Sequence, residues 1–302
     1  MSRLSRFFRL KKYRKQRNRL LIISAAALAV FVLGFLMHRA FTRIEGPKAS
    51  IPSNEILIHD RYEGQKLIPK YSIAKNAYQD SKFSVENGIR TYADKNASKG
   101  VDVSSWQGNI NWTKVKKVGM TFTFIRVGYR GQTKGSIFDD EKFTQNMKEA
   151  SAAGLKLGVY FYSQAVSASE AAEEADYVIE KIKPYHVTWP VVFDWEPGEG
   201  EETSTSGLRT QNVIPEQVSS FTKVFCDRVK AAGYQPCFYT NKNMGYTTFD
   251  LKLLSSIPMW YAEYRPLPSF YYHFDIWQYV SKGHIDGISG NADINIAFRK
   301  FG

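Results

Sequence analysis

Two carboxylates stand two positions apart in the stretch WPVVFDWEP, where Asp194 and Glu196 follow an apolar run that is typical of a buried strand. Alternate residues of a strand point to the same side, so the two acids share one face and Trp195 takes the other. Two carboxyl groups this close cannot both ionise freely, and burial raises the pKa further. A protonated carboxyl beside a second acid is what cleavage of a glycosidic bond requires. An isolated D-x-E pair is more often part of a solvated loop.

Two further acids lie on other predicted strands. Asp102 is in the first apolar run, GVDVSSWQG, and Asp293 is in the last, GNADINIAF. The first and last strands of a closed barrel are neighbours, so both acids could approach the pair on the fourth strand. Each also has a local explanation, as a cap or turn residue for Asp102 and an Asx turn for Asp293. Four acids at one mouth favour a catalytic site.

Aromatic and polar side chains in the same runs favour a sugar as ligand. Flat rings stack on the apolar faces of sugars, although roughly half of these rings should belong to the core. A polar group within a strand-like run needs a partner, either in the protein or in a bound ligand. The candidate substrate-binding residues are Tyr129, Tyr160, Tyr162, Tyr239, Trp260, Tyr261, Glu263, Gln278 and Arg126.

The elements that must position these residues form a regular alternation. Five β-rich runs, GVDVSSW, FTFIRVGY, KLGVYFYS, WPVVFDWE and PCFYTN, are separated by helical stretches, which predicts parallel strands with crossover helices. After about Ser256 three strand-like runs follow closely, too close for further helices. We therefore expect an α/β fold, a modified TIM-like barrel with five βα units and extra closing strands.

Basic residues gather at the N-terminus. Of the 41 Lys and Arg residues, 12 lie within residues 1–48, where Glu45 is the single acid, so the other 29 basic residues face 28 acids. The net charge of +12 is therefore local, and the rest of the chain is close to neutral. A nucleic-acid partner, which needs a basic surface, is not expected for the main domain.

An uncharged apolar stretch, Leu20 to Met37, follows the basic tail. It can cross a bilayer as a slightly short helix. A cleavable signal peptide is the alternative, but the stretch is long for one and FLMHRAFTR has no clear cleavage site. We expect residues 1–19 to form a cytoplasmic tail and residues 20–38 a single-pass transmembrane helix, an uncleaved signal anchor. Nine basic residues precede it, so the positive-inside rule places the remaining domain in the periplasm or outside the cell.

The rest of the chain divides into a stem and a barrel domain. Residues 39–81 contain Pro, Gly and mixed charges without sustained periodicity, which predicts a stem. The barrel domain is expected at residues 82–302, with its catalytic core at residues 100–302. Asn87 and Gly88 separate two short alternating runs, which predicts a hairpin ahead of the core.

Two cysteines, Cys226 and Cys237, fit either a disulfide in an oxidising compartment or two buried thiols, and buried thiols are favoured. No group of Cys and His residues has the spacing of metal ligands. Neither a metal nor a cofactor is therefore expected.

The order and spacing of these motifs resemble glycoside hydrolase family 25, the muramidases or Chalaropsis-type lysozymes. The resemblance runs from about residue 100 to residue 301 through GVDVSSWQG, FTFIRVGY, GVYFYS, DWE, MWYAEY, IWQY and GISGNADIN. It implies a peptidoglycan hydrolase that cleaves the β-1,4 bond between N-acetylmuramic acid and N-acetylglucosamine. By position, Glu196 resembles the general acid and Asp194 its partner, with Asp102 and Asp293 as flanking acids. Trp195 departs from the smaller residue usual there.

Several routes and functions are compatible with this pattern. Carboxyls about 5 Å apart favour a retaining reaction and those beyond about 6.5 Å an inverting one. We favour a third route, in which the 2-acetamido oxygen of the substrate is the nucleophile, Asp194 orients that group and Glu196 acts first as acid and then as base. The alternatives in function are a catalytically inactive, membrane-tethered glycan-binding module and a hydrolase of chitin or another β-glycan.

Overall fold

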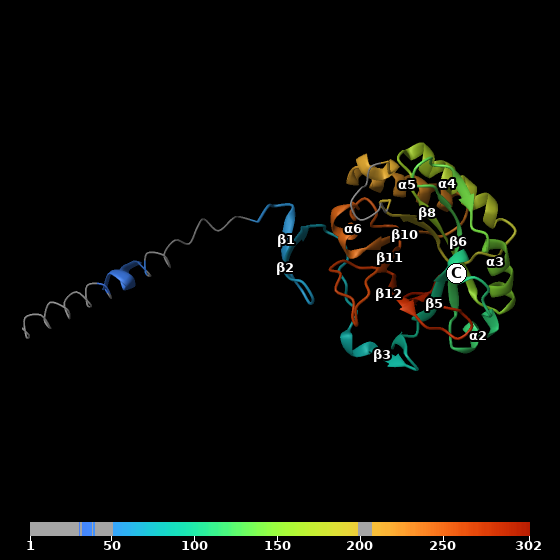
Figure 1. Ribbon diagram of the computed structural model, residues 1–302, viewed down its shortest axis with the longest axis horizontal. Coiled ribbons are helices and arrows are strands. Elements are labelled where there is room, and N and C mark those ends of the chain that lie inside the picture. The colour runs from blue at the N-terminus through green and yellow to red at the C-terminus, as the bar shows by residue number, and fades with distance from the viewer. Residues whose placement is uncertain (1–29, 31, 38, 40–50, 199–206) are drawn as a thin grey trace, which may run out of the picture. The chain divides into compact units, whose positions relative to one another are not determined.

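The computed structural model of the protein describes residues 30, 32–37, 39, 51–198 and 207–302 (Figure 1). The chain divides into two compact units, residues 1–52 and residues 53–302. In the first unit the described residues up to 39 are helical, and their apolar side chains are exposed. Most of the predicted tail and membrane span lies outside the described residues. Within the described part of the chain, no helix has the length and apolar character needed to span a membrane.

The second unit is built around a closed barrel of eight strands. Six neighbouring pairs, from β5–β6 to β11–β12, are parallel, whereas β12–β13 and β13–β5 are antiparallel and close the barrel. A ninth strand, β7 (Ile137–Asp139), extends the edge of β6. The barrel strands in spatial order are β5 (Ser98–Val103), β6 (Phe122–Arg130), β8 (Lys156–Ser163), β9 (Val191–Trp195), β10 (Pro236–Asn241), β11 (Met259–Ala262), β12 (Ile276–Gly283) and β13 (Ala292–Ala297).

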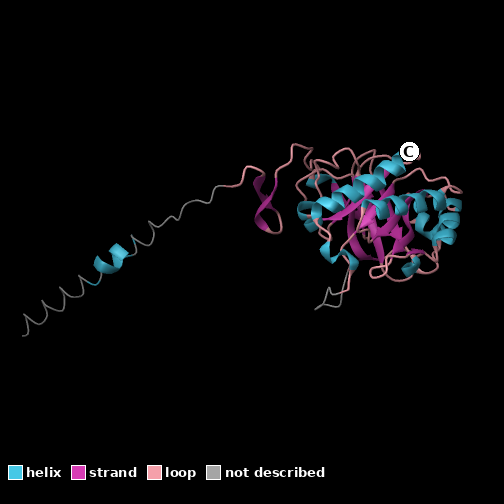
Figure 2. Cartoon of the chain, turned by 90° about the horizontal axis from the view of Figure 1, so that it is seen from above, coloured by secondary structure: helices cyan, strands magenta, loops and turns pink. Residues whose placement is uncertain are grey.

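A helix follows each of the first five barrel strands, as the alternation of the sequence predicts. Local signals fix these helices, because Ser167 caps one by accepting a hydrogen bond from the Glu170 N–H and Pro215 begins the next. Strands β11, β12 and β13 are joined by loops. Figure 2 shows the helices wrapped around the strands. They are α2 (Trp112–Lys117), α3 (Phe143–Ala152), α4 (Ala168–Ile182), α5 (Pro215–Ala231) and α6 (Lys242–Thr247).

Alternation along each strand separates two apolar cores. Inside the barrel, Phe124 stacks on Trp260 with ring centroids 4.8 Å apart. Outside it, Phe193 of β9 packs on Phe225 of α5 at 4.9 Å. Each barrel strand therefore sends one set of side chains inward, toward the interior and its mouths, and the other set toward the covering layer.

The segment ahead of the barrel is folded onto it. Residues 51–81, which we expected to belong to a stem, contain the hairpin of β1 (Glu55–Asp60) and β2 (Gly64–Pro69) and contact the barrel domain. The Asn76 side-chain amide donates to the Phe270 carbonyl at 3.1 Å, and the Tyr78 ring stacks on Phe298 at 3.8 Å. This part of the expected stem thus contains a two-stranded hairpin, followed by residues that pack on the barrel.

The predicted hairpin at Asn87 and Gly88 is confirmed. It joins β3 (Phe83–Glu86) to β4 (Ile89–Tyr92), and its two turn residues have φ values of 52° and 80°. Such positive angles suit the Asn-Gly pair of a two-residue turn. Cys226 and Cys237 are both buried and form no disulfide, which confirms the interpretation as buried thiols.

Candidate active site

Asp102 and Asp293 are direct partners across the antiparallel pair β5–β13. Asp102 is buried and receives hydrogen bonds from Gln278 Nε2, 2.9 Å from each carboxyl oxygen, and from Asn295 Nδ2 at 2.7 Å. Burial raises the pKa of Asp102 to about 6, although these two amide donors favour its charged form. Burial, and then the charge of Asp102, raise the pKa of Asp293 to about 8.

Asp194 occupies the inner face of β9, and Glu196 follows it on the same side. Between them, Trp195 points outward, where its Nε1 donates to the Ala165 carbonyl at 2.9 Å, so the predicted division of faces is confirmed. Burial, and next the charges of Glu196 and Asp102, raise the pKa of Asp194 well above its ordinary value. Its Oδ1 is buried and has no hydrogen-bond partner, so a bound ligand could supply one.

The four predicted acids meet at one mouth of the barrel. The charges of Glu196 and Asp102 act on Asp194, and the charge of Asp102 acts on Asp293. Burial raises the pKa of Tyr160 well above its ordinary value, and the charges of Asp102, Asp194 and Asp293 add to this effect. They meet because the inner faces of β5, β9 and β13 carry them toward the same end, where closure of the barrel makes β5 and β13 neighbours.

Two residues that the sequence did not single out, Asn295 and Tyr264, complete the network around Asp102. Asn295 Oδ1 accepts a hydrogen bond from Trp260 Nε1 at 2.8 Å, while the Tyr264 hydroxyl donates to Gln278 Oε1 at 2.8 Å. A signal was available for Asn295, which stands two positions after Asp293 and therefore on the same face. Tyr264 lies just beyond β11, where strand alternation no longer applies.

Trp260 was a candidate for stacking on a sugar, but the structure places it inside the barrel. Its side chain is 2% exposed and packs between Phe124 and Tyr239. The indole therefore fills the barrel and holds Asn295 rather than presenting a face to ligand. Tyr239 and Tyr160 each meet it edge to face, at 5.1 and 6.0 Å, and line the floor beneath the acids.

Arg126 and Tyr129 both face the mouth, which simple alternation does not predict for residues three apart. A bulge between Arg126 and Gly128 shifts the register of β6 against β8, and this irregularity turns Tyr129 to the same side. Arg126 Nε donates to Asp140 at 2.8 Å, and its guanidinium carbon lies 5.4 Å from the centre of the Tyr129 ring. The positive charge of Arg126 lowers the pKa of Asp194, against the larger effect of burial. Tyr129 pairs with Tyr162, which pairs with Asp194.

Two predicted substrate-binding residues are directed away from the mouth. Tyr261 follows the inward Trp260, so it points outward, is fully buried and stacks on Phe270 at 4.8 Å. Glu263 accepts hydrogen bonds from Ser269 N at 2.7 Å and Oγ at 2.6 Å, which commits its carboxylate to the loop after β11. The sequence motif MWYAEY contains both residues but does not reveal which side faces the ligand.

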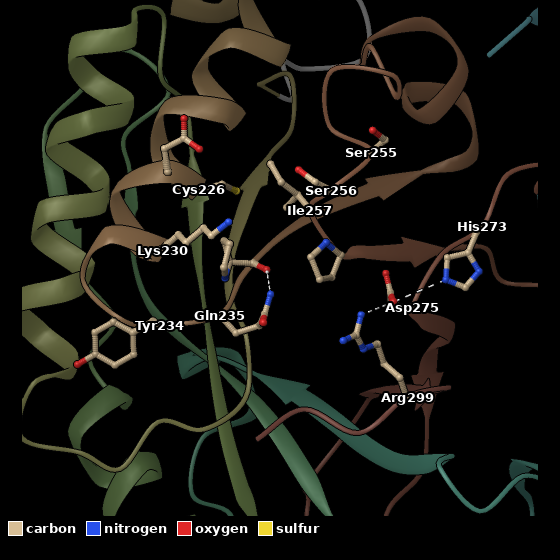
Figure 3. A pocket seen from close by; sticks show the side chains of 13 residues that line it. Cys226, Lys230, Tyr234, Gln235, Ser255, Ser256, Ile257, His273, Asp275 and Arg299 are labelled. Atoms are coloured by element: carbon tan, nitrogen blue, oxygen red, sulfur yellow. Dashed lines mark hydrogen bonds and ion pairs between the residues drawn. The ribbon is translucent and has the colours of Figure 1, made fainter. Parts of the chain in front are cut away.

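A second carboxyl environment, at the opposite end of the barrel, is distinct from this mouth. A cavity of about 440 Å³ lies beside the beginnings of β10, β11 and β12, and Figure 3 shows His273 and Arg299 directed toward Asp275 inside it. Arg299 Nη1 is 3.3 Å and His273 Nε2 is 3.6 Å from Asp275 Oδ1. None of the four acids lines this cavity.

Hydrogen bonds from neighbouring side chains fix the backbone that follows β9. Gln164, which is fully buried, donates from Nε2 to the Glu196 carbonyl at 2.6 Å. Arg209 donates to the Gln164 carbonyl at 3.2 Å and pairs with Glu170 at 2.5 Å. These contacts fix the point at which the chain leaves β9, and so the height of Glu196 in the mouth.

The comparisons with known proteins agree with this geometry. The sequence profile of glycosyl hydrolases family 25 matches residues 101–288. The chain is 29% identical over 213 residues to lysozyme M1 of Streptomyces globisporus, covering 67% of this chain and 68% of that protein. It is 28% identical over 202 residues to the autolytic lysozyme of Clostridium acetobutylicum, covering 65% of this chain and 55% of that protein.

Solved structures share the fold. The modular autolysin LytC from Streptococcus pneumoniae, solved with a synthetic peptidoglycan ligand, aligns with a TM-score of 0.59 and 24% identity over 82% of this chain and 57% of that chain. A family 25 glycosyl hydrolase from Bacillus anthracis gives a TM-score of 0.56 and 21% identity, over 70% and 93%. The chain thus spans little more than half of LytC and of the clostridial lysozyme.

A mixed eight-stranded barrel with carboxyl groups gathered at one mouth provides the paired acids that glycoside hydrolysis requires. With a family profile that covers most of the barrel, the chain belongs to glycosyl hydrolases family 25, the family of peptidoglycan-hydrolysing lysozymes.

Proposed function

We propose that the protein is an N-acetylmuramidase, which cleaves the β-1,4 bond between N-acetylmuramic acid and N-acetylglucosamine in peptidoglycan. Glu196 donates the proton to the leaving oxygen and then activates water as a base. Asp194 assists it, while Asp102 and Asp293 complete the site. The intact set of four acids argues against a module that only binds glycan.

The buried Asp194 carboxyl carries this proposal. Its side chain lies on the inner face of β9 near Glu196, and its Oδ1 is buried without a hydrogen-bond partner. A buried acceptor without a partner costs free energy unless a ligand donor fills the gap. The N–H of a 2-acetamido group is such a donor, and the amino sugars of peptidoglycan carry it.

The same contact supports the substrate-assisted route. If Asp194 accepts a hydrogen bond from the acetamido N–H, it orients the acetamido oxygen toward the sugar carbon, so that this oxygen bonds to the carbon as the bond to the leaving oxygen breaks. Glu196 protonates the leaving oxygen at the same time. The first product then keeps its anomeric configuration. Inverted product in early NMR spectra would overturn this route.

The decisive experiment uses the full-length chain and its Glu196→Gln and Asp194→Asn variants with purified peptidoglycan, separating the fragments by mass. We expect new reducing ends at muramic acid with the unsubstituted chain and a loss of at least about 100-fold in both variants, the range for removing a general acid. An Asp227→Asn variant, changed at an exposed acid of α5, is the matched control. Reducing ends at glucosamine instead would assign a different bond.

We also propose that residues 20–38 anchor the enzyme in the membrane as an uncleaved signal anchor, with the N-terminus in the cytoplasm and the barrel in the periplasm or outside the cell. The uncharged stretch and the basic residues ahead of it support this proposal. The described helical residues add exposed apolar side chains, Leu33 at 61% and Phe35 at 56%. Fractionation of cells after an alkaline wash tests it, since release of the full-length chain from the membranes would contradict an anchor.

A further inference from the structure

A row of side chains crosses four strands from the acids to the edge of the sheet. Asp194 on β9 pairs with Tyr162 on β8, which pairs with Tyr129 on β6, which pairs with Phe138 on β7. Residues paired across strands point to the same side. Three strand spacings of about 4.8 Å make the row about 14 Å long, which is longer than one sugar ring.

The outer end of this row is aromatic and open to solvent. The Tyr129 and Phe138 rings are stacked, with centroids 5.3 Å apart and planes 24° from parallel. Phe138 is 47% exposed, although an apolar side chain of its size gains free energy from burial. The Arg126 guanidinium over Tyr129 holds the ring from the inner side.

A second exposed ring stands beside the row. Trp106 is 85% exposed, on the turn that follows β5. Its turn is rigid, because Trp106 N donates to Ser104 Oγ at 3.2 Å, Ser104 N donates to Gln107 Oε1 at 2.9 Å, and Gln107 Nε2 reaches the Asn291 carbonyl. The exposure of Trp106 is therefore imposed by the fold and is not that of a loosely held loop.

The buried carboxylate of Asp140 links the two segments that carry the exposed rings of Trp106 and Phe138. Asp140 accepts hydrogen bonds from Ser105 N at 2.9 Å and from Arg126 Nε at 2.8 Å. Ser105 precedes Trp106, and Asp140 lies two residues after Phe138. Arg126 Nη2 donates to Ser105 Oγ at 3.2 Å, which closes the cluster. Trp106 and Phe138 thus flank a fixed ion pair at the rim of the mouth.

We propose that Trp106, Tyr129 and Phe138, the aromatic ledge, form an outer subsite for sugar rings of the glycan strand beyond the pair joined by the cleaved bond. Aromatic faces bury the apolar faces of pyranose rings. The ledge begins two strand spacings, about 10 Å along the sheet, from Asp194 and extends a further strand outward to Phe138. The subsite makes the enzyme prefer long strands. This inference rests on the proposed muramidase function.

The test compares Trp106→Ala, Phe138→Ala and the double variant, in the full-length chain, on two substrates: a tetrasaccharide and long glycan strands freed of peptides. On long strands we expect kcat/KM to fall about tenfold in each single variant, through KM, a change equivalent to about 1.4 kcal/mol. On the tetrasaccharide we expect no change. Leu253→Ala removes an exposed apolar side chain from the opposite end of the barrel and is the control.

Two outcomes would overturn the ledge: unchanged kcat/KM on long strands, or an equal loss on both substrates, which would assign the rings to the cleavage site or to folding. Thermal unfolding of each variant identifies the latter. Calorimetric binding of long strands to Glu196→Gln, with and without Trp106→Ala, separates this inference from the proposed function. If the unsubstituted chain cleaves neither substrate, the muramidase assignment fails, whereas weaker binding after Trp106→Ala still supports the ledge.

Discussion

The two sides of the barrel are covered in different ways. Strands β6, β8, β9 and β10 pack on α3, α4 and α5, whereas no helix follows β11, β12 or β13. On that second side, aromatic residues from ahead of the barrel cover the outer face. Tyr78 stacks on Phe298, and Phe83 meets Trp277 edge to face at 5.6 Å. Figure 1 shows the helices along one side and β3 at the other.

This difference shows that residues outside the family match cover part of the barrel. The match begins at residue 101, but the covering residues lie between 53 and 99. Strands β11 to β13 carry large apolar side chains on their outer faces, among them Trp277, which is fully buried and contacts Phe83. Without the preceding segment this ring would lose part of its cover, at a cost of roughly 25 cal/mol for each Å² exposed.

The largest expected effect comes from removing this cover. A chain that begins at residue 100 should fail to fold cooperatively, whereas a chain that begins at residue 51 should unfold at the same temperature as the full-length protein. Near-ultraviolet circular dichroism during heating measures both. If the chain from residue 100 kept a cooperative transition at an unchanged temperature, the preceding segment would not contribute to the stability of the barrel.

Matched aromatic substitutions compare the two covers directly. Phe225→Ala removes a fully buried ring from α5, and we expect it to cost about 3–5 kcal/mol. Tyr78→Ala removes a partly buried ring and the hydroxyl that donates to the Phe274 carbonyl, at about 3 kcal/mol. Urea unfolding measures both. Val85→Ala, at a side chain that is 58% exposed on β3, should change stability by less than about 0.5 kcal/mol.

A smaller loss of stability is expected when the ion pairs between Lys242 and the β1–β2 hairpin are removed. Lys242 Nζ lies 2.6 Å from Asp60 Oδ2 and 2.8 Å from Glu63 Oε1. Lys242→Met leaves the buried Asp60 without its partner and should cost about 2–3 kcal/mol at neutral pH. Lys66→Met, at a more exposed pair, should cost less than about 1 kcal/mol. Equal losses of stability for Lys242→Met and Lys66→Met in urea unfolding would contradict the stabilising role of Lys242.

The pH dependence of the Lys242→Met defect provides a second check. Burial alone would raise the pKa of Asp60, but the Lys242 ammonium and the N–H groups of Tyr62 and Glu63 outweigh it and lower the pKa from 3.8 to about 2. The folded-state pKa is depressed, so this contribution to stability is present above pH 4 and disappears as the pH falls to about 2. The difference between the variant and the unsubstituted chain should shrink over that range.

The smallest effect has the opposite sign and lies at the mouth, where β13 of the helix-free side brings Asp293 to the site. Burial and the charge of Asp102 raise the pKa of Asp293 from 3.8 to about 8. The folded state therefore resists its ionisation, and stability is lost as the pH rises from 4 to 8. Asp293→Asn should add about 1–2 kcal/mol at pH 8 and nothing near pH 4, while activity falls.

Thermal unfolding at several pH values measures this gain. Asp286→Asn, at an exposed acid in the loop before β13, should leave the pH profile unchanged. A destabilised Asp293→Asn variant at pH 8 would show that the charged carboxylate is stabilised in the fold, contrary to the effect of its burial.

Much of the site could be predicted because strand alternation and strand order are properties of the sequence. The inward direction of Asp194 and the outward direction of Trp195 follow from a period of two. The same rule, applied to Trp260, would have placed Tyr261 and Glu263 outside. Strand alternation cannot place Arg126 and Tyr129 on the same face, because they are three residues apart. The bulge that does so has no clear signal in a single sequence.

The sequence by itself determined the alternation of five strands and helices, the closing strands and the acids they carry, because short-range patterns record which residues are buried. Only the tertiary structure decided which aromatic rings face the mouth, which fill the barrel and which acids lose their solvent. Those outcomes depend on contacts between residues far apart in the chain, such as Asn295 with Asp102 and Tyr78 with Phe298. No local pattern encodes such contacts.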